Sequence, residues 1–465
     1  MRHPAIRPTL ALALGAGLIA TLGACALTPA YERPAVPVDG QFPSPSAASG
    51  PAASTLPWRN FLTDARTQAL VDAALKNNRD LRIALLNVAQ ARAALGVQQA
   101  DRLPTVGVGA AVERNSASSA YSAGLTLSSF ELDLFGRVRS LGDAAAARLL
   151  AGEEARRAVE LSLIAAVADA ELSLRADDEL IGVTAQVLAS REASLRLVRL
   201  KFDGGAAGEP ELRATESLVA GARATGQALE RQRAQHLNAL VLLVGGPLPA
   251  DLPAARALTA HSFADLPAGL PSEVLLQRPD VRQAEQLLIA STFNIGAARA
   301  AFFPRIALTG NLGVASGELS GLFSNGVWSF AGQLLQPLFD NGRNEANLAS
   351  ARAAREIAVA QYEKALQSAF REVADTLAAR ATLGAQLQAQ REQADAETRR
   401  LALVERLLSA GAASLLDRLD AERSALAARQ AVVQLELARR QNALLLYRVL
   451  GGGVGAGAVG GGPPA

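Results

Sequence analysis

Few residues of this sequence are suited to catalysis. The 465 residues include three histidines, His3, His236 and His261, and one cysteine, Cys25. No spacing of serine, histidine and acid, of cysteine and histidine, or of metal ligands brings them together in a motif. The glycine-rich stretches lack the preceding strand and following helix that a phosphate-binding loop requires. We therefore predict no enzyme activity, no metal and no cofactor.

The cysteine indicates a different chemistry, covalent lipid attachment. A basic start with Arg2 and Arg7 precedes an apolar run over residues 10–22, and small residues stand directly before Cys25. This order resembles a bacterial lipoprotein signal, whose cleavage leaves the cysteine as a lipid-carrying first residue. Ala26 is not the aspartate that usually retains such lipoproteins in the inner membrane, so the resemblance implies the outer membrane. The alternative is an uncleaved membrane anchor.

Composition and charge exclude further classes of function and indicate the class of fold. The formal net charge is +2, and Lys and Arg are scattered without a basic cluster, so we expect no nucleic-acid partner. Ala, Leu, Arg, Glu and Gln dominate after residue 140, a mixture typical of long helices and coiled coils. Apart from the signal, no apolar run reaches the ~18 residues that a membrane-spanning helix requires. Strands are therefore the candidates for any segment that lies in a membrane.

The chain is an internal duplication. Residues 80–104 align without a gap with residues 280–304, and both stretches end in a proline. Farther along, the offset becomes 206 positions, which pairs Gly205 with Gly411. Each half therefore repeats one plan, and the repeat extends to the far end of its longest helix.

Each half is predicted to contain a helix, two strands and a long helical hairpin. Pro104 and Pro304 stop a helix and favour extended backbone, so they mark the transition from helix to strand. In the returning strand of the first half, the apolar phase shifts from Leu125 and Leu127 to Phe130, which predicts either a β-bulge or a strand that passes from one environment to another. Proline-free runs of about sixty residues predict helices of roughly 90 Å. The predicted helices cover 63–76, 80–102, 143–202, 211–244, 280–303, 345–409 and 415–450, and the strands lie within 104–135 and 304–339.

The domain organisation follows from these elements. We predict a lipoprotein signal peptide at 1–24, an extended N-terminal leader at 25–60, repeat 1 at 61–245, a linker in an equatorial region at 246–277, repeat 2 at 278–450 and a disordered glycine-rich tail at 451–465. The leader is rich in proline and is expected to pack along the outside of the body.

Neither the strands nor the long helices are expected to be complete in one chain. Each strand is long enough for a tilted outer-membrane strand and alternates apolar with small or polar residues. Four strands cannot close a barrel, and open edges cannot lie in lipid because their backbone groups would stay unpaired. Three chains would supply twelve strands, and their hairpins would bury one another's apolar faces. The alternative is two ordinary hairpins on a soluble core.

The predicted fold is thus mainly α with a membrane β part. Long antiparallel helical hairpins would form a trimeric α-barrel, and a trimeric β-barrel of twelve strands, four from each chain, would continue it. Such an assembly would be a conduit.

Several motifs, in order and in both halves, resemble the outer membrane factor family, TolC-like efflux lipoproteins of the NodT type. They are SFELDLFGR, RLKFDGG, RPDVRQAE, ARAAFFPRIALTG, FDNGR, FREVADTL and YRVLGGG. The resemblance implies a homotrimer in outer membrane lipid that docks to a periplasmic adaptor, the membrane fusion protein, and an inner-membrane pump. It also implies a route for drugs or other small toxic compounds out of the cell. Type I protein secretion, metal-ion efflux and a lipid-anchored coiled-coil scaffold remain alternatives.

The resemblance also implies a gate at the periplasmic helical turns. Leu416 and Asp420 occupy the positions of the family's constriction leucine and aspartate, and residues four apart share one helical face. Asp417 is a further candidate, although an ion pair with Arg418 would rotate the acid group. The alternative is that Leu416 belongs to a coiled-coil core and that Asp420 is a solvated surface acid. The turns themselves are expected to contact the adaptor through Gly204, Gly205, Ala206, Gly411 and Ala412.

Overall fold

The fold is taken from a computed structural model, which describes residues 27–42, 53–260, 263, 264, 266 and 272–453. Cys25 with the predicted signal, His261 and residues 454–465 lie outside the described residues. The chain forms two compact units, and each draws on both halves of the duplication. Unit 1 comprises Met1–Pro37, Leu85–Ala155 and Asp280–Ala365, and unit 2 comprises Val38–Ala84, Arg156–Pro279 and Leu366–Ala465.

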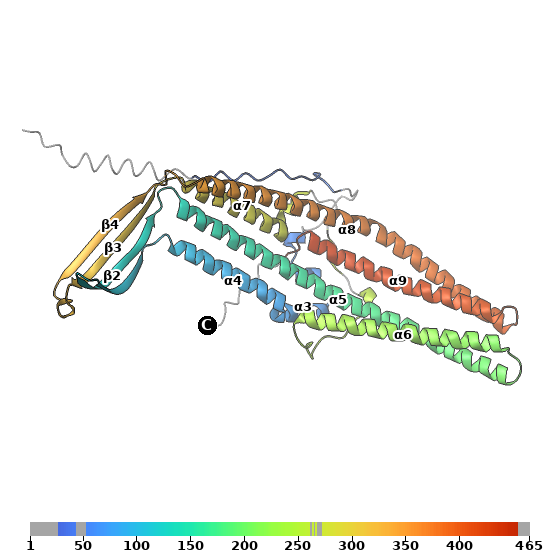
Figure 1. The fold of residues 1–465 in the computed structure, drawn as a ribbon. Coiled ribbons are helices and arrows are strands. Elements are labelled where there is room, and N and C mark those ends of the chain that lie inside the picture. Colours follow the sequence, from blue (N-terminus) through green and yellow to red (C-terminus); the bar gives the residue numbers. More distant parts are fainter. Residues whose placement is uncertain (1–26, 43–52, 261–262, 265, 267–271, 454–465) are drawn as a thin grey trace, which may run out of the picture. The chain divides into compact units, whose positions relative to one another are not determined.

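The sheet of unit 1 has four antiparallel strands in the order β1-β2-β3-β4. They are β1 (Thr105–Arg114), β2 (Ser119–Leu132), β3 (Arg305–Ser316) and β4 (Gly326–Leu335), and the short 3-10 helix η4 (Leu319–Gly321) joins the last two. Figure 1 shows β2, β3 and β4 side by side. All four predicted strands are confirmed. The last one ends at Leu335, four residues before the predicted limit at residue 339.

Each hairpin of the sheet starts just after a helix that a proline has ended. Helix α4 (Arg79–Ala100) precedes Pro104, and helix α7 (Pro279–Ala300) precedes Pro304. A proline lacks the N–H that the next helical hydrogen bond needs and disfavours helical backbone at the residue before it. The chain therefore changes from helix to strand at the two positions that the sequence predicts.

The predicted bulge in β2 is confirmed. Its pairing with β3 shifts register between Leu127 and Phe130, and Leu127 pairs with Gly310 while Phe130 pairs with Leu308. The bulge adds one residue to β2, because Ser128 and Ser129 stand opposite Thr309 alone. As a result, the apolar side chains of β2 stay on one face of the sheet along its whole length.

The first part of the leader packs on α7 in extended form. The predicted extended segment does not continue to residue 60, because the 3-10 helix η1 (Ala53–Thr55) and helix α2 (Trp58–Phe61) lie at its end. Arg33 Nε donates a hydrogen bond to Glu285 Oε1 at 2.7 Å, and Tyr31 Oη donates to the same oxygen at 2.9 Å. Gly296 makes room for the leader, because a Cβ at this position would lie 2.9 Å from the Cα of Thr28. A Cβ at its repeat counterpart, Gly96, would meet no other atom within 4 Å. Gly296 is thus needed for close approach of the leader and Gly96 is not.

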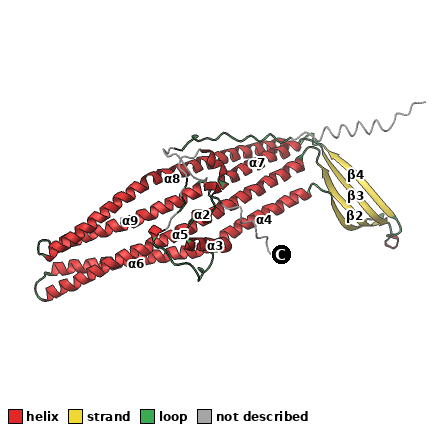
Figure 2. Cartoon of the chain, turned by 180° about the vertical axis from the view of Figure 1, so that it is seen from behind, coloured by secondary structure: helices red, strands yellow, loops and turns green. Residues whose placement is uncertain are grey.

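Helical hairpins make up most of unit 2, and their long arms α5 (Arg137–Asp203) and α8 (Arg343–Ser409) begin in unit 1. Helix α5 pairs with α6 (Glu209–Val244), and α8 pairs with α9 (Leu415–Val449), as Figures 1 and 2 show. The shorter elements are η1 (Ala53–Thr55), α2 (Trp58–Phe61), α3 (Ala65–Asn77), η2 (Leu258–Ala260) and η3 (Ser272–Gln277). No helix in the described part of the chain combines the length and the apolar character that crossing a bilayer demands.

Both long helices start earlier than predicted. Each spans 67 residues, about 100 Å, and they begin at Arg137 and Arg343 instead of 143 and 345. The cause is an upstream aspartate at each start. Asp133 Oδ2 accepts a hydrogen bond from the Arg139 N–H at 2.7 Å, and Asp340 Oδ2 accepts from the Asn344 N–H at 2.9 Å. These carboxylates satisfy N–H groups that the first helical turn leaves unpaired.

The core of unit 2 contains a stack of aromatic rings. Phe61 stacks on Tyr447 and on Phe263, with ring centroids 4.2 and 5.1 Å apart. Tyr447 Oη donates to the Leu56 carbonyl at 2.8 Å, and the Gly453 N–H donates to the Ala53 carbonyl at 2.8 Å. The predicted start of the disordered tail at 451 is therefore wrong. Residues 451–453 are buried, because they pair with the segment that precedes α2.

Candidate functional site at the helical turns and the sheet

The two helical turns of unit 2 share one geometry. Gly205 and Gly411 each adopt φ +73°, a left-handed conformation that favours glycine. The N–H of the residue after each glycine donates a hydrogen bond to a carbonyl of the preceding helix. Ala206 donates to the Lys201 carbonyl at 2.7 Å, and Ala412 donates to the Leu407 carbonyl at 2.8 Å. The five predicted tip residues, Gly204, Gly205, Ala206, Gly411 and Ala412, are all exposed.

Leu416 lies in the first turn of α9 and is exposed. Its relative exposure is 75%, the highest among the described large apolar residues of unit 2 apart from Leu242. The side chain therefore does not belong to the core of its own hairpin. An apolar side chain held in this position is available for contact with another chain.

Asp420, one turn after Leu416, is paired with two arginines. Its Oδ2 accepts a hydrogen bond from Arg400 Nη2 of α8 at 3.1 Å, and its Oδ1 accepts from Arg423 Nη2 at 2.8 Å. These contacts, the one from Arg400 first, lower the pKa of the carboxyl group. A lowered pKa means that the pairing is lost only when the pH falls below the usual aspartate range. At neutral pH, salt is the condition that weakens this exposed contact.

Asp417 does not pair with Arg418, so that expectation is wrong. Its Oδ2 accepts hydrogen bonds from the Ser414 N–H at 2.9 Å and from Ser414 Oγ at 2.6 Å, and Ser414 Oγ accepts from the Asp417 N–H at 3.1 Å. This is a capping box, in which serine and acid satisfy each other's backbone donors. The same hydrogen bonds from Ser414 lower the pKa of Asp417. The carboxylate therefore fixes the start of α9.

A buried ion pair joins the two hairpins near their turns. Arg191 Nε of α5 contacts Glu422 Oε1 of α9 at 2.7 Å, and the Glu422 side chain is only 4% exposed. Arg191 Nη1 also donates to the Leu218 carbonyl of α6 at 3.1 Å. From α9, Arg418 reaches back to α5 and donates to Ser194 Oγ at 2.5 Å. These residues were not predicted from the sequence, although Glu422 lies 206 positions after Glu216, at the offset of the repeat.

The sheet of unit 1 has two chemically different faces. One face carries small and polar side chains, which include Gly107, Gly109, Ser122, Gly124, Thr126, Thr309, Asn311 and Ser329. The other face is apolar and includes Val106, Val108, Leu125, Leu127, Phe130, Ile306, Leu308, Leu312, Trp328 and Leu334. Such alternation is the pattern of a strand between lipid and water.

A charged cluster lies where the strands begin. Arg305 Nη2, in the residue after Pro304, contacts Glu131 Oε2 at 2.6 Å, and Arg137 Nη2 at the start of α5 contacts the same oxygen at 2.7 Å. Glu131 therefore links the start of β3 to the start of α5. In the first half, the residue after Pro104 is Thr105, which carries no charge. It therefore cannot form the ion pair that Arg305 forms after Pro304.

A comparison with protein families matches this arrangement. The family model described as outer membrane efflux protein covers residues 70–246 and 270–452, one match for each half of the duplication. The chain belongs to the outer membrane efflux protein family. The predicted resemblance is thereby confirmed.

Other outer membrane efflux proteins are similar along almost their whole length. Outer membrane protein OprJ of Pseudomonas aeruginosa is 43% identical over 470 residues, which cover 97% of this chain and 97% of OprJ. The toluene efflux pump outer membrane protein TtgI of Pseudomonas putida is 42% identical over 452 residues, 93% of this chain and 96% of TtgI. The open state of the Neisseria gonorrhoeae MtrE outer membrane channel is 40% identical, with a TM-score of 0.86 and coverage of 92% and 98%.

Membership in this family confirms the predicted fold class and location. The chain is an outer membrane efflux protein with a large periplasmic part, and its fold is that of solved outer membrane channels. Family members are channels.

Among the described residues, no group of three or more His, Cys, Asp or Glu side chains could hold a metal ion. His236 instead pairs through Nδ1 with the buried Asp177 at 2.6 Å.

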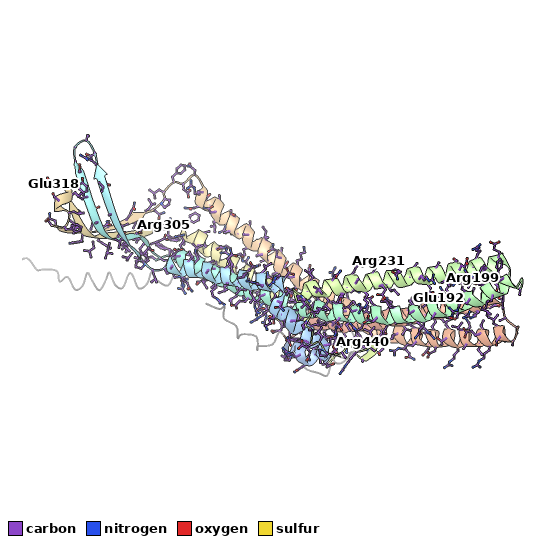
Figure 3. All side chains as sticks on the ribbon, turned by 90° about the horizontal axis from the view of Figure 1, so that it is seen from below. Glu192, Arg199, Arg231, Arg305, Glu318 and Arg440 are labelled. Atoms are coloured by element: carbon purple, nitrogen blue, oxygen red, sulfur yellow. The ribbon has the colours of Figure 1, made fainter. Side chains whose placement is uncertain are left out.

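In this efflux protein, the Glu422→Ala substitution is expected to loosen the hairpin ends. Removal of the carboxylate leaves Arg191 largely buried without its ionic partner, which typically costs about 3 to 5 kcal/mol. Backbone hydrogen exchange in α5 and α9 around this pair should therefore become faster. The matched control is Glu216→Ala, because Glu216 is the repeat counterpart and its partner, Arg199, is exposed (Figure 3). Equal acceleration in both variants would contradict the assignment.

Proposed function

We propose that three copies of the chain form a closed duct through the outer membrane and into the periplasm. The observation that carries this proposal is the sheet, which has one apolar face, one small and polar face, and two open edges at β1 and β4. In lipid, an open edge would leave backbone groups without hydrogen-bond partners. Edge-to-edge pairing between three chains removes both edges and makes a barrel of twelve strands. The small and polar face then lines a wide lumen.

The helical turns form the gate of this duct. Leu416 and Asp420 lie on one face of α9, where Leu416 is exposed and Asp420 half-exposed in the single chain, and three copies of each would meet at the axis. Carboxylates gathered there repel one another, so the closed state depends on contacts such as the one from Arg400 to Asp420. A partner that displaces Arg400 would favour opening. Asp417 holds the turn in place and is not assigned to the constriction itself.

The duct works with a periplasmic adaptor and an inner-membrane pump. The exposed turns at Gly205 and Gly411 supply the adaptor contact, because they are the points at which both hairpins end in the same geometry. The relatives are named for pumps that export toluene, solvents and antibiotics. We assign small toxic compounds of this kind as the cargo.

Restoration of solvent resistance tests this function. A host that lacks the chain should lose resistance to toluene, and expression of the wild type should restore it. The double variant Gly205→Val/Gly411→Val should reach the outer membrane without restoring resistance, since a branched side chain is strained at φ +73°. Gly221→Val is the control, because this glycine lies within α6 and has open space around it. If the wild type fails to restore resistance, protein secretion or metal-ion efflux replaces this function.

The N-terminus is attached to lipid through Cys25. The support is the start of the described leader, where Arg299 Nη1 of α7 donates to the Leu27 carbonyl at 3.1 Å. Arg299 comes five residues before Pro304, so the chain two residues after Cys25 is held close to the level at which β3 starts. A lipid-linked sulfur does not react with maleimide, which gives this assignment a direct chemical test.

A further inference from the structure

A cavity of about 400 Å³ lies in unit 2, and none of the residues that line it belongs to the helical turns. Its walls come from α2, α8, α9 and the chain after η2, and they include the apolar side chains Phe61, Phe263, Leu383 and Leu446. Ligand pockets typically enclose ~300 to 1,000 Å³ and combine apolar walls with a few placed polar groups. This cavity therefore has the size and lining of a small-molecule site.

The polar part of the cavity is cationic. Arg380, Arg439 and Arg440 line it, and no lining residue within the described part of the chain is acidic. Arg380 Nη1 donates to the Leu266 carbonyl at 2.7 Å. Arg440 is 8% exposed, and its Nε is buried without a hydrogen-bond partner. Figure 3 labels Arg440 on α9, where this helix meets the short helices from the first part of the chain. A buried guanidinium N–H without an acceptor is costly unless a ligand supplies one.

The nearby acid does not balance these charges. Glu436 accepts hydrogen bonds from three guanidinium groups, those of Arg440 at 2.6 Å, Arg439 at 3.1 Å and Arg391 at 3.1 Å. Burial lowers the pKa of Arg440, and the charge of Arg439 acts in the same direction, while those of Glu436 and Glu179 oppose the shift. Three cations on one buried carboxylate leave a surplus of positive charge beside the cavity.

We propose that this cavity binds a small organic anion. Its carboxylate, sulfonate or phosphate group would accept hydrogen bonds from Arg439 and Arg440, and its apolar ring or chain would lie against Phe263 and Leu446. Guanidinium groups suit planar oxyanions because they offer donors in a fork. The site is separate from the proposed gate and does not depend on what the duct transports.

Calorimetry on the full-length protein in lipid nanodiscs tests the proposal, with naphthalene-2-carboxylate as the probe. The wild type should bind the probe and should bind the neutral naphthalene-2-carboxamide about tenfold more weakly, since the charged hydrogen bonds are lost. Empty nanodiscs correct for partition into lipid. Absence of binding to the wild type, or equal binding of the acid and the amide, would overturn the proposal.

Matched variants separate the cavity from general charge effects. Arg439→Gln should weaken probe binding about tenfold. Arg391→Gln should leave it unchanged, because Arg391 contacts the same Glu436 at the same distance but does not line the cavity. Gly384→Leu should abolish binding by filling the cavity, since Gly384 lies in its wall on α8 and faces open space. This variant also improves helix propensity, so loss of folding is not expected. Equal losses in Arg391→Gln and Arg439→Gln would overturn the assignment.

Discussion

Replacement of Leu416 and Asp420 together by serine should raise the single-channel conductance of the protein in planar bilayers several-fold. Leu416 is 75% exposed at the helical turn, and Asp420 is tied by Arg400 to the neighbouring arm of its hairpin. Serine is smaller than leucine and carries no charge, so the double variant widens the constriction and also removes the contact that holds α9 against α8. Both changes favour the open state of the proposed gate.

The control for this experiment is the first half of the duplication. Ala214 is the counterpart of Asp420 at the 206-residue offset, and Ala214→Ser should leave the conductance unchanged. The double variant should still run as a heat-sensitive trimer in detergent, because neither residue is part of the buried core. Intact trimers with unchanged conductance would show that the constriction lies elsewhere.

The sequence predicted the elements whose signals are local. Pro104 and Pro304 marked the ends of α4 and α7, and the phase shift between Leu127 and Phe130 marked the bulge in β2. These features depend on residues that are close in the chain, through backbone geometry that holds in any tertiary context. The duplication then located the second set of elements from the first.

The sequence did not predict the features that depend on distant partners. Glu216 and Glu422 are equivalent in the repeat, yet only Glu422 is buried, because Arg191 of the other hairpin covers it. Residues 451–453 read as part of a flexible tail, although they pair with the chain before α2. Such contacts join residues hundreds of positions apart and leave no periodic signal.

The capping box at the start of α9 has a sequence signal that was not used in the predictions. Ser414 and Asp417 have the spacing of a capping box at the start of α9, and this local motif excludes the expected pair between Asp417 and Arg418. The roles of Leu416 and Asp420 rest on their place in the family and on their exposure. Their meeting at an axis involves three chains, so the contacts of a single chain cannot display it.

The reaction of one introduced cysteine at a time with a membrane-impermeant, water-soluble maleimide in intact outer membranes tests the duct most directly. Asn311 and Leu312 are neighbours in β3 and lie on opposite faces of the sheet, Asn311 on the small and polar face and Leu312 on the apolar face. If three sheets close around a water-filled lumen, the first side chain lies in water and the second in lipid.

The wild type supplies the background, because Cys25 is its one cysteine. A lipid-linked Cys25 does not react, whereas labelling of the wild type would contradict lipid attachment. We expect Asn311→Cys to be labelled rapidly and Leu312→Cys to remain unlabelled. Similar labelling of the two variants would mean that both faces meet water, and it would contradict a sheet that spans the outer membrane as the wall of a duct.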